Sequence, residues 1–153
     1  MAMKLTPELA EFIGFWKMRR TEKAVGIEGN VDAQERFANY VLSLRLAPAD
    51  KIISDEKAIW FSNLKIKNFF EDTVKHQGEI FDRPNRISAA YLRGMYLSKG
   101  DGPTLDNVKF SDQLLIERMG FYTKRKERKM WIKDFEKFKA FIEGKKTQKP
   151  NEK

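Results

Sequence analysis

The 153-residue chain contains no cysteine and only one histidine, His76. The lack of cysteine excludes disulfides and thiolate metal sites, although it leaves the redox compartment undetermined. A single histidine also disfavours a histidine-based zinc site and a Ser-His-Asp triad. We interpret His76 as an exposed residue near the C-terminus of a helix, and we expect no catalytic residue, metal site or cofactor.

Long apolar segments are missing as well. No apolar run in the sequence approaches the roughly 20 residues needed to cross a bilayer. Residues 1–11 lack the apolar core of a signal peptide. We therefore expect an intracellular, cytoplasmic protein that is soluble and has no membrane partner.

Basic residues are abundant. The chain has 30 Lys and Arg against 22 Asp and Glu, a net charge of +8 and a pI near 9.6. Lys and Arg supply most of the sequence-independent affinity for nucleic acids, because they neutralise phosphates. Since 41% of the residues are hydrophobic, the chain can also bury a core. These features favour one folded domain, or two small packed halves, with a polyanionic partner.

A helical segment with a small residue four positions before a glycine occurs twice. The first copy contains Ala10 and Gly14, and the second contains Ala90 and Gly94, 80 positions later. Residues four apart share one helix face, so each helix has a spot poor in side chains. A glycine inside a helix costs about 1 kcal/mol relative to alanine, which calls for a reason. We predict that the two helices pack against each other at these residues.

The remaining segments predict short strands and further helices in both halves. These predictions rest on capping residues, on the helical spacing of apolar side chains and on alternation within strands. In the first half we expect a helix from Thr6 to about Met18, a strand at 23–30, a helix capped by Asp32, a strand pair at 51–55 and 58–64, and a helix from about Asn63. In the second half we expect a helix capped by Ser88, a strand at 105–110, a helix capped by Asp112 and ended by Gly120, a strand pair within 121–132, and a helix capped by Asp134.

The common order of these elements indicates a tandem duplication. Equivalent tryptophans, Trp60 and Trp131, end the strand pairs and lie 71 positions apart, so the second half is shorter by about nine residues before its strand pair. We predict an α+β fold with a pseudo-two-fold axis in a monomer. Its parts are a first half at 1–78, a linker at 79–86, a second half at 87–144 and a basic flexible tail at 145–153.

The duplicated helices resemble the motif helices of the LAGLIDADG homing endonuclease family in its single-chain form. The nine-letter motif falls on FIGFWKMRR at 12–20 and on LRGMYLSKG at 92–100. The second copy keeps the leucine, both glycines and the apolar pair, whereas the first keeps one glycine and the apolar pattern. The stretch AYLRG at 90–94 is also similar to the motif-derived domain of WhiA-type regulators, which lack nuclease chemistry.

This resemblance implies two αββαββα halves, with the motif helices at the pseudo-dyad. Four-stranded antiparallel sheets would then form a saddle over a duplex. In the active family, an acidic residue five positions after the first glycine of each motif holds divalent cations. Those positions carry Arg19 and Lys99 here. Carboxylates suit Mg²⁺, whereas guanidinium and ammonium groups only donate hydrogen bonds. The resemblance therefore implies a catalytically inactive relative, and we do not expect Glu22 or Asp101 to rebuild a metal site.

Our main hypothesis is a saddle that binds nucleic acid through its phosphates. The basic side chains expected to make contact lie at the base of the saddle and in the last hairpin: Arg19, Arg20, Lys99, Lys124, Arg125, Lys126, Arg128 and Lys129. Strand alternation predicts Lys124, Lys126 and Arg128 on one face, and Arg125, Glu127 and Lys129 on the other. The alternative is that this hairpin is only a solvated surface turn.

The kind of nucleic acid and two other functions stay open. DNA and structured RNA, including ribosomal RNA, both fit, with a slight preference for a duplex. A protein–protein interaction module, for example within a ribonucleoprotein, is one alternative. An active metal-dependent endonuclease with relocated acids is the other. We expect the tryptophans, Trp16, Trp60 and Trp131, to pack in the core rather than to stack on bases.

Overall fold

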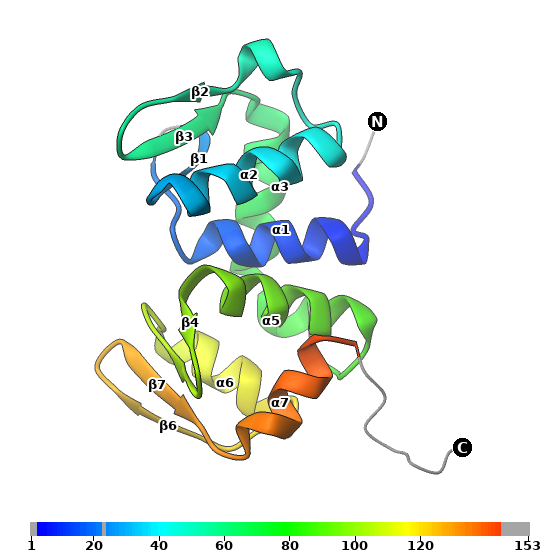
Figure 1. Ribbon diagram of the computed structural model, residues 1–153. Helices are drawn as coiled ribbons and strands as arrows, with labels where there is room; N and C mark the ends of the chain where they lie inside the picture. Colours follow the sequence, from blue (N-terminus) through cyan, green and yellow to red (C-terminus); the bar gives the residue numbers. More distant parts are fainter. Residues whose placement is uncertain (1–2, 23, 145–153) are drawn as a thin grey trace.

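The computed structural model describes residues 3–22 and 24–144, and its two halves lie on either side of a central pair of helices (Figure 1). These helices are α1 (Pro7–Lys17) and α5 (Arg86–Lys99), which pack side by side. The α+β class, the duplication and the central position of the two motif helices are thus confirmed. Lys23 and the predicted tail at 145–153 lie outside the described residues.

Each half continues from its central helix with short strands and further helices. The first half contains β1 (Val25–Glu28), α2 (Val31–Ser43), η1 (Ala49–Lys51), β2 (Ile53–Ser54), β3 (Ala58–Phe61) and α3 (Leu64–Lys75). The second contains β4 (Gly100–Asp101), β5 (Thr104–Leu105), α6 (Phe110–Arg118), β6 (Thr123–Lys126), β7 (Lys129–Ile132) and α7 (Phe135–Ile142). A short helix, α4 (Gln77–Ile80), joins them and overlaps the start of the predicted linker. Of the helices described, none is long and apolar enough to cross a membrane.

The strands form two antiparallel sheets, in the orders β1-β3-β2 and β4-β5-β7-β6. Their registers carry the duplication, because Ile27 faces Ile59 in the first sheet and Leu105 faces Met130 in the second. Ile59 and Met130 are 71 positions apart, which is the offset predicted from the tryptophans.

The expectation of a four-stranded sheet in both halves is wrong for the first half. There, the strand equivalent to β4 is reduced to a single bridge between Arg20 and Ile27. In the second half, Asp101 pairs with Thr104 across a two-residue turn. The first half instead needs a longer loop between Arg20 and β1, and this loop passes through Ala24 in a left-handed conformation (φ 51°). Two backbone hydrogen bonds flank the bridge: the N–H of Thr21 donates to the carbonyl of Gly26 at 3.0 Å, and the N–H of Glu28 donates to that of Arg19 at 2.9 Å.

Three helices begin two or three residues earlier than predicted. The N-caps are Asn30, Asn85 and Lys109, rather than Asp32, Ser88 and Asp112. Asn85 accepts from the backbone N–H of Ser88 at 2.9 Å, while its own N–H donates to the Ser88 hydroxyl at 3.0 Å. Such a capping box places the second polar residue inside the first turn.

The other predicted helix starts are confirmed, whereas the strand predicted at 105–110 is shorter than expected. Thr6 and Asn63 cap α1 and α3 as predicted. The strand expected at 105–110 ends at Leu105, because α6 already begins at Phe110. Asp134 does stand at the N-cap of α7, in a left-handed conformation and without a capping hydrogen bond from its side chain.

The central helices meet backbone to backbone at their glycines. A Cβ on Gly14 would lie 2.2 Å from the carbonyl oxygen of Tyr91, and a Cβ on Gly94 would lie 1.9 Å from that of Glu11. Any side chain at either position would force the helices apart, which accounts for the glycine in each. The two preceding small residues, Ala10 and Ala90, are fully buried.

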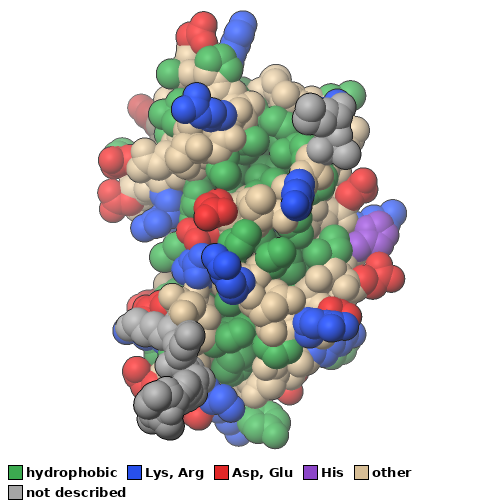
Figure 2. Space-filling model, turned by 90° about the vertical axis from the view of Figure 1, so that its right-hand side faces the viewer, with side chains coloured by type: hydrophobic (Ala, Val, Ile, Leu, Met, Phe, Trp, Pro, Cys, Tyr) green, Lys and Arg blue, Asp and Glu red, His purple; other side chains and the backbone are tan. Residues whose placement is uncertain are grey.

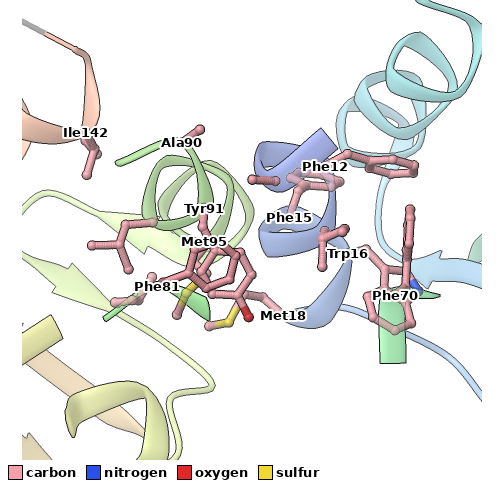
Figure 3. Close-up of a cluster of buried hydrophobic side chains, with 14 of the residues drawn as sticks. Phe12, Phe15, Trp16, Met18, Phe70, Phe81, Ala90, Tyr91, Met95 and Ile142 are labelled. Carbon is pink, nitrogen blue, oxygen red and sulfur yellow. The ribbon is translucent and has the colours of Figure 1, made fainter. Parts of the chain in front are cut away.

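Aromatic side chains fill the core around this helix pair (Figure 3). In the first half, Phe12 and Trp16 each pack against Phe70 of α3, with ring centroids 5.4 Å apart. In the second half, Phe81 stacks on Tyr91 at 4.0 Å. Figure 3 shows the two groups on opposite sides of the central helices. The aromatic groups of the two halves thus lie on either side of the seam, within one continuous cluster of buried side chains.

Candidate nucleic-acid interface

A cleft of about 790 Å³ opens between the halves where α1 and α5 end. Both helices end on the side of the molecule that carries the sheets (Figure 1). Basic side chains from both halves line the cleft: Lys17, Arg19, Arg20, Lys67, Lys99, Lys109 and Arg128. The carboxylates among its lining are fewer: Glu22, Glu28, Glu71 and Asp112. The cleft is therefore an electropositive recess at the pseudo-dyad.

Arg19 follows α1 and reaches across to the end of α5. Its Nε and Nη2 donate to the carbonyl oxygen of Ser98 at 3.0 and 2.8 Å, and its Nη1 donates to that of Glu28 at 3.3 Å. Gly29 leaves space for the guanidinium, since a Cβ there would lie 2.8 Å from Nη1. Burial lowers the pKa of Arg19, but an arginine remains protonated in proteins. The side chain therefore caps the opposite helix while its charge lines the cleft.

The end of α1 is closed in the same way by the second half. Nδ2 of Asn107 donates to the carbonyl oxygen of Met18 at 2.8 Å, and Nη1 of Arg128 donates to Oδ1 of Asn107 at 3.0 Å. Met18 and Ser98 are 80 positions apart, so the two accepting carbonyls are equivalent in the repeat. Sequence reasoning missed Asn107. Its left-handed conformation (φ 60°), which asparagine tolerates well, is the signal that marks this turn.

Lys99 stands at the position equivalent to Arg19. It is half-buried and lines the cleft. Its carbonyl oxygen accepts from the N–H of Asp106 at 3.0 Å, but within residues 3–22 and 24–144 its ammonium makes no hydrogen bond or ion pair. Arg20 is exposed, with its Cζ 4.9 Å from the centre of the Trp16 ring. Together with Arg128, four of the eight basic residues singled out from the sequence thus meet in this cleft.

The groups at the two helix ends do not fit a divalent cation. Arg19 and Lys99 offer only donors, and the carbonyls of Met18 and Ser98 already accept N–H groups. Among the residues that the structure describes, no three Asp, Glu or His side chains are placed to hold a metal ion. Glu22 lines the cleft, whereas Asp101 is not part of its lining.

A buried ion pair joins the halves at the floor of the cleft. Nζ of Lys17 on α1 contacts Oδ1 of Asp112 on α6, and their side chains are only 8% and 2% exposed. Gln77 donates to the same oxygen at 3.1 Å, and the hydroxyl of Tyr91 donates to Oε1 of Gln77 at 2.6 Å. Burial lowers the pKa of Lys17. Burial would raise the pKa of Asp112, but Lys17 and the N–H of Lys109 hold it below its ordinary value.

A second ion pair crosses the seam. Nε of Arg93 lies 2.7 Å from Oε1 of Glu11, and the hydroxyl of Tyr40 donates to Oε2 of Glu11 at 2.5 Å. Nη1 of Arg93 also contacts the carbonyl oxygen of Ile142 at the end of α7. Ion pairs in two places along the seam therefore fix the halves relative to each other and give the cleft a set width.

The hairpin of β6 and β7 presents lysines on its exposed face. Lys124 pairs with Trp131, and Lys126 pairs with Lys129. Residues directly opposite each other share a face of the sheet, so all four lie on the same side. The prediction that Lys129 lies on the other face with Arg125 is wrong, because the two-residue turn makes Lys126 and Lys129 direct partners.

Arg125 does lie on the opposite face, against α6. Its Nε donates to Oε1 of Gln113 at 3.1 Å, and its Cζ lies 5.9 Å from the centre of the Phe110 ring. Nη1 of Arg125 also contacts the carbonyl oxygen of Glu127. Arg125 is thus tied to its own half, whereas Lys124 and Lys126 are exposed.

The charge is concentrated in one half of the repeat. Residues 1–80 contain 12 Lys and Arg against 12 Asp and Glu, residues 81–144 contain 14 against 9, and residues 145–153, outside the described part of the chain, contain 4 against 1. On the exposed face of the first sheet, the cross-strand partners of Trp60 are Gly26 and Ile53. Both halves therefore contribute basic side chains to the cleft, but the net positive charge comes from the second half.

The side of the molecule opposite the sheets, at the right of Figure 1, is different (Figure 2). Lys and Arg side chains do not gather there, and charges of both signs are scattered around hydrophobic surface. The cleft and the second sheet are therefore the better candidates for a polyanion.

Comparison with solved structures identifies the fold. A glycine-to-serine variant of I-DmoI, in a crystal with its target DNA and magnesium, superposes with a TM-score of 0.58 and 11% identity, covering 92% of this chain and 98% of that one. The N-terminal LAGLIDADG domain of WhiA superposes with a TM-score of 0.56 and 14% identity, covering 99% and 90%. No protein-family model and no curated protein matches the sequence. The chain therefore has a LAGLIDADG-like fold, with both motif helices in a single polypeptide.

Proposed function

We propose that the protein binds nucleic acid along the cleft and the exposed face of the second sheet, and that it does not cleave it. The observation that carries this proposal is the pair of cations, Arg19 and Lys99, at equivalent ends of the central helices. Arg20 and Arg128 join them in the same recess. Guanidinium and ammonium groups are the side chains that recognise phosphate.

The structural neighbours support the partner but leave its kind open. The I-DmoI variant was crystallised with its target DNA, so this fold can hold a DNA target. The cleft and the lysines of the second sheet supply phosphate contacts, which duplex DNA and structured RNA offer alike. Crosslinking in the native cells, with sequencing of the bound DNA and RNA, would decide between the two.

The absence of cleavage follows from the groups at the helix ends. A metal ion held there would face two cations, and the nearby carbonyls already accept hydrogen bonds. We expect supercoiled plasmid to remain intact with Mg²⁺ or Mn²⁺, at protein concentrations that shift it fully in a gel. Nicking that disappears in an Asp101→Asn or Glu22→Gln variant would overturn the claim of inactivity.

Binding can be tested by the response to salt. Affinity for a labelled oligonucleotide should fall steeply between 50 and 200 mM salt, because binding releases counterions from the phosphates. Lys99→Ala should weaken binding, whereas Lys75→Ala, an exposed lysine at the end of α3, should not. Salt-independent binding of a protein partner, with no nucleic-acid binding, would favour the interaction-module alternative.

A further inference from the structure

Trp131 lies on the solvent face of the second sheet and is 40% exposed. Lys124 faces it across one strand pair and Thr104 faces it across the other. The ammonium of Lys129 is 6.0 Å from its ring centre. The core packing expected from the sequence is therefore wrong for this residue. Its indole lies beside Lys124 and Lys129, with Lys126 on the same face. Two carboxylates are near: Asp101 lies beyond Thr104 on this face, and Asp106 lies 3.9 Å from the ammonium of Lys129.

The equivalent residue of the first half has different surroundings. Trp60 occupies the matching register position and is less exposed. Its direct neighbours are Gly26 and Ile53, the latter 52% exposed. The duplication thus places the same aromatic side chain opposite Lys124 in one half, and opposite Gly26 and Ile53 on a face that also carries Glu28 in the other.

We propose that Trp131 is a stacking platform for an unpaired nucleobase, and that Lys124, Lys126 and Lys129 hold the phosphates that flank this base. The inference rests on the proposed nucleic-acid binding and names the form of nucleic acid that the second sheet takes. Base stacking on an aromatic side chain within a positively charged groove is a general means of binding single strands.

The chemistry of the surface favours unpaired nucleotides over a continuous duplex. In a duplex, neighbouring base pairs cover both faces of each base, so an indole has no ring face to stack on. An unpaired nucleotide exposes that face. Lys124 and Lys126 are two positions apart on one strand, which separates them by about 7 Å. That spacing suits successive phosphates of an extended single strand.

The experiment compares three probes of about 12 nucleotides at fixed salt: oligo-dT, oligo-rU and a mixed-sequence DNA duplex. Fluorescence anisotropy of the labelled probe gives the affinity, and tryptophan quenching reports stacking. The variants are Trp131→Ala, Trp131→Phe and, as the matched control from the other half, Trp60→Ala. Thermal unfolding confirms that each variant is folded, which is expected because Trp131 is on the surface.

We expect Trp131→Ala to weaken binding of both single strands about tenfold or more, and to leave duplex binding within about twofold. Trp131→Phe should restore most of the lost affinity, because it keeps a ring face, and Trp60→Ala should have little effect. Comparing oligo-dT with oligo-rU distinguishes the two kinds of nucleic acid, because tighter binding of one probe identifies the partner as unpaired DNA or as unpaired RNA.

Two results would overturn the inference. The first is single-strand binding that is unchanged in Trp131→Ala but weaker in an additional variant, Lys124→Ala. That result would show that Lys124 contacts phosphate and that Trp131 does not stack on a base. If wild-type protein binds none of the probes, the proposed function fails and the inference fails with it.

Discussion

Asp112 is the most buried charged residue of the described chain, and Lys17 is its counter-ion. We expect Asp112→Asn to lower the free energy of unfolding at pH 7 by about 3–5 kcal/mol, because it leaves the ammonium of Lys17 buried without a charge partner. Adding Lys17→Met should recover part of this loss. Urea unfolding of the two single variants and the double variant measures the coupling between the residues. A double variant as unstable as the sum of its parts would show that they do not interact.

The same pair predicts the direction of the pH dependence. The folded-state pKa of Asp112 is lowered, so the unfolded chain takes up this proton at a higher pH than the folded chain does. The ion pair therefore stabilises the folded protein fully above the unfolded-state pKa of about 4. This stabilisation is lost as the pH falls through the folded-state pKa of Asp112. Below pH 5, the free energy of unfolding of the Asp112→Asn variant should fall less steeply with decreasing pH than that of the wild type. Equal slopes would contradict this assignment.

Sequence reasoning recovered individual residues only where a local pattern pointed to them. Gly14 and Gly94 follow from their spacing, whereas Arg19 and Lys99 follow from the resemblance to the LAGLIDADG motif. The pairing of Lys17 with Asp112 spans 95 positions, and a helical pattern holds no information about such a distant partner. Asn107 was missed for the same reason, because its role depends on the end of the opposite helix.

At the scale of elements, the seam between α1 and α5 depends on close contact of the two backbones. We expect Gly94→Ala to destabilise the protein by about 1–3 kcal/mol or more, since the new methyl group would overlap backbone atoms of Glu11 and Phe15. Alanine has the higher helix propensity, so an isolated helix would gain from the change. A lower free energy of unfolding for Gly94→Ala would therefore show that packing across the seam outweighs helix propensity.

Gly78→Ala in α4 is the matched control for this change. Its methyl group would meet only the flexible end of the Arg118 side chain, at 2.8 Å. We expect a change of less than about 1 kcal/mol, measured by the same urea titration. If both glycine variants are equally stable, the helices of the seam do not approach as closely as the structure shows.

Element type and order were predictable, whereas element boundaries were less so. Helical spacing identified the helices, and alternation with aromatic side chains identified β3 and β7. Boundaries failed where two polar residues compete for one cap, as Asn85 and Ser88 do. The reduced first strand was missed because its pairing depends on the length of a loop rather than on the residues within it.

At the scale of the whole molecule, the two halves share a fold but not a charge. Only the second half carries net positive charge, and its sheet face adds Lys124, Lys126 and Lys129 to the cations of the cleft. The two halves have the same fold, whereas the basic residues of the exposed sheet face lie in the second half. The footprint on a nucleic acid should therefore be asymmetric about the pseudo-dyad, even though the two halves share a fold.

This asymmetry predicts unequal effects of removing lysines from the two halves. We expect replacement of Lys124, Lys126 and Lys129 by alanine to lower the slope of log affinity against log salt by roughly 2–3, because each phosphate contact contributes about 0.7–0.9 to that slope. The matched control removes three exposed lysines of the first half, Lys51, Lys57 and Lys75, and so changes the net charge equally. A similar loss of slope in both triple variants would mean that the protein responds to total charge alone. A loss confined to the second half would establish that the duplicated fold contacts its partner mainly through one of its two sheets.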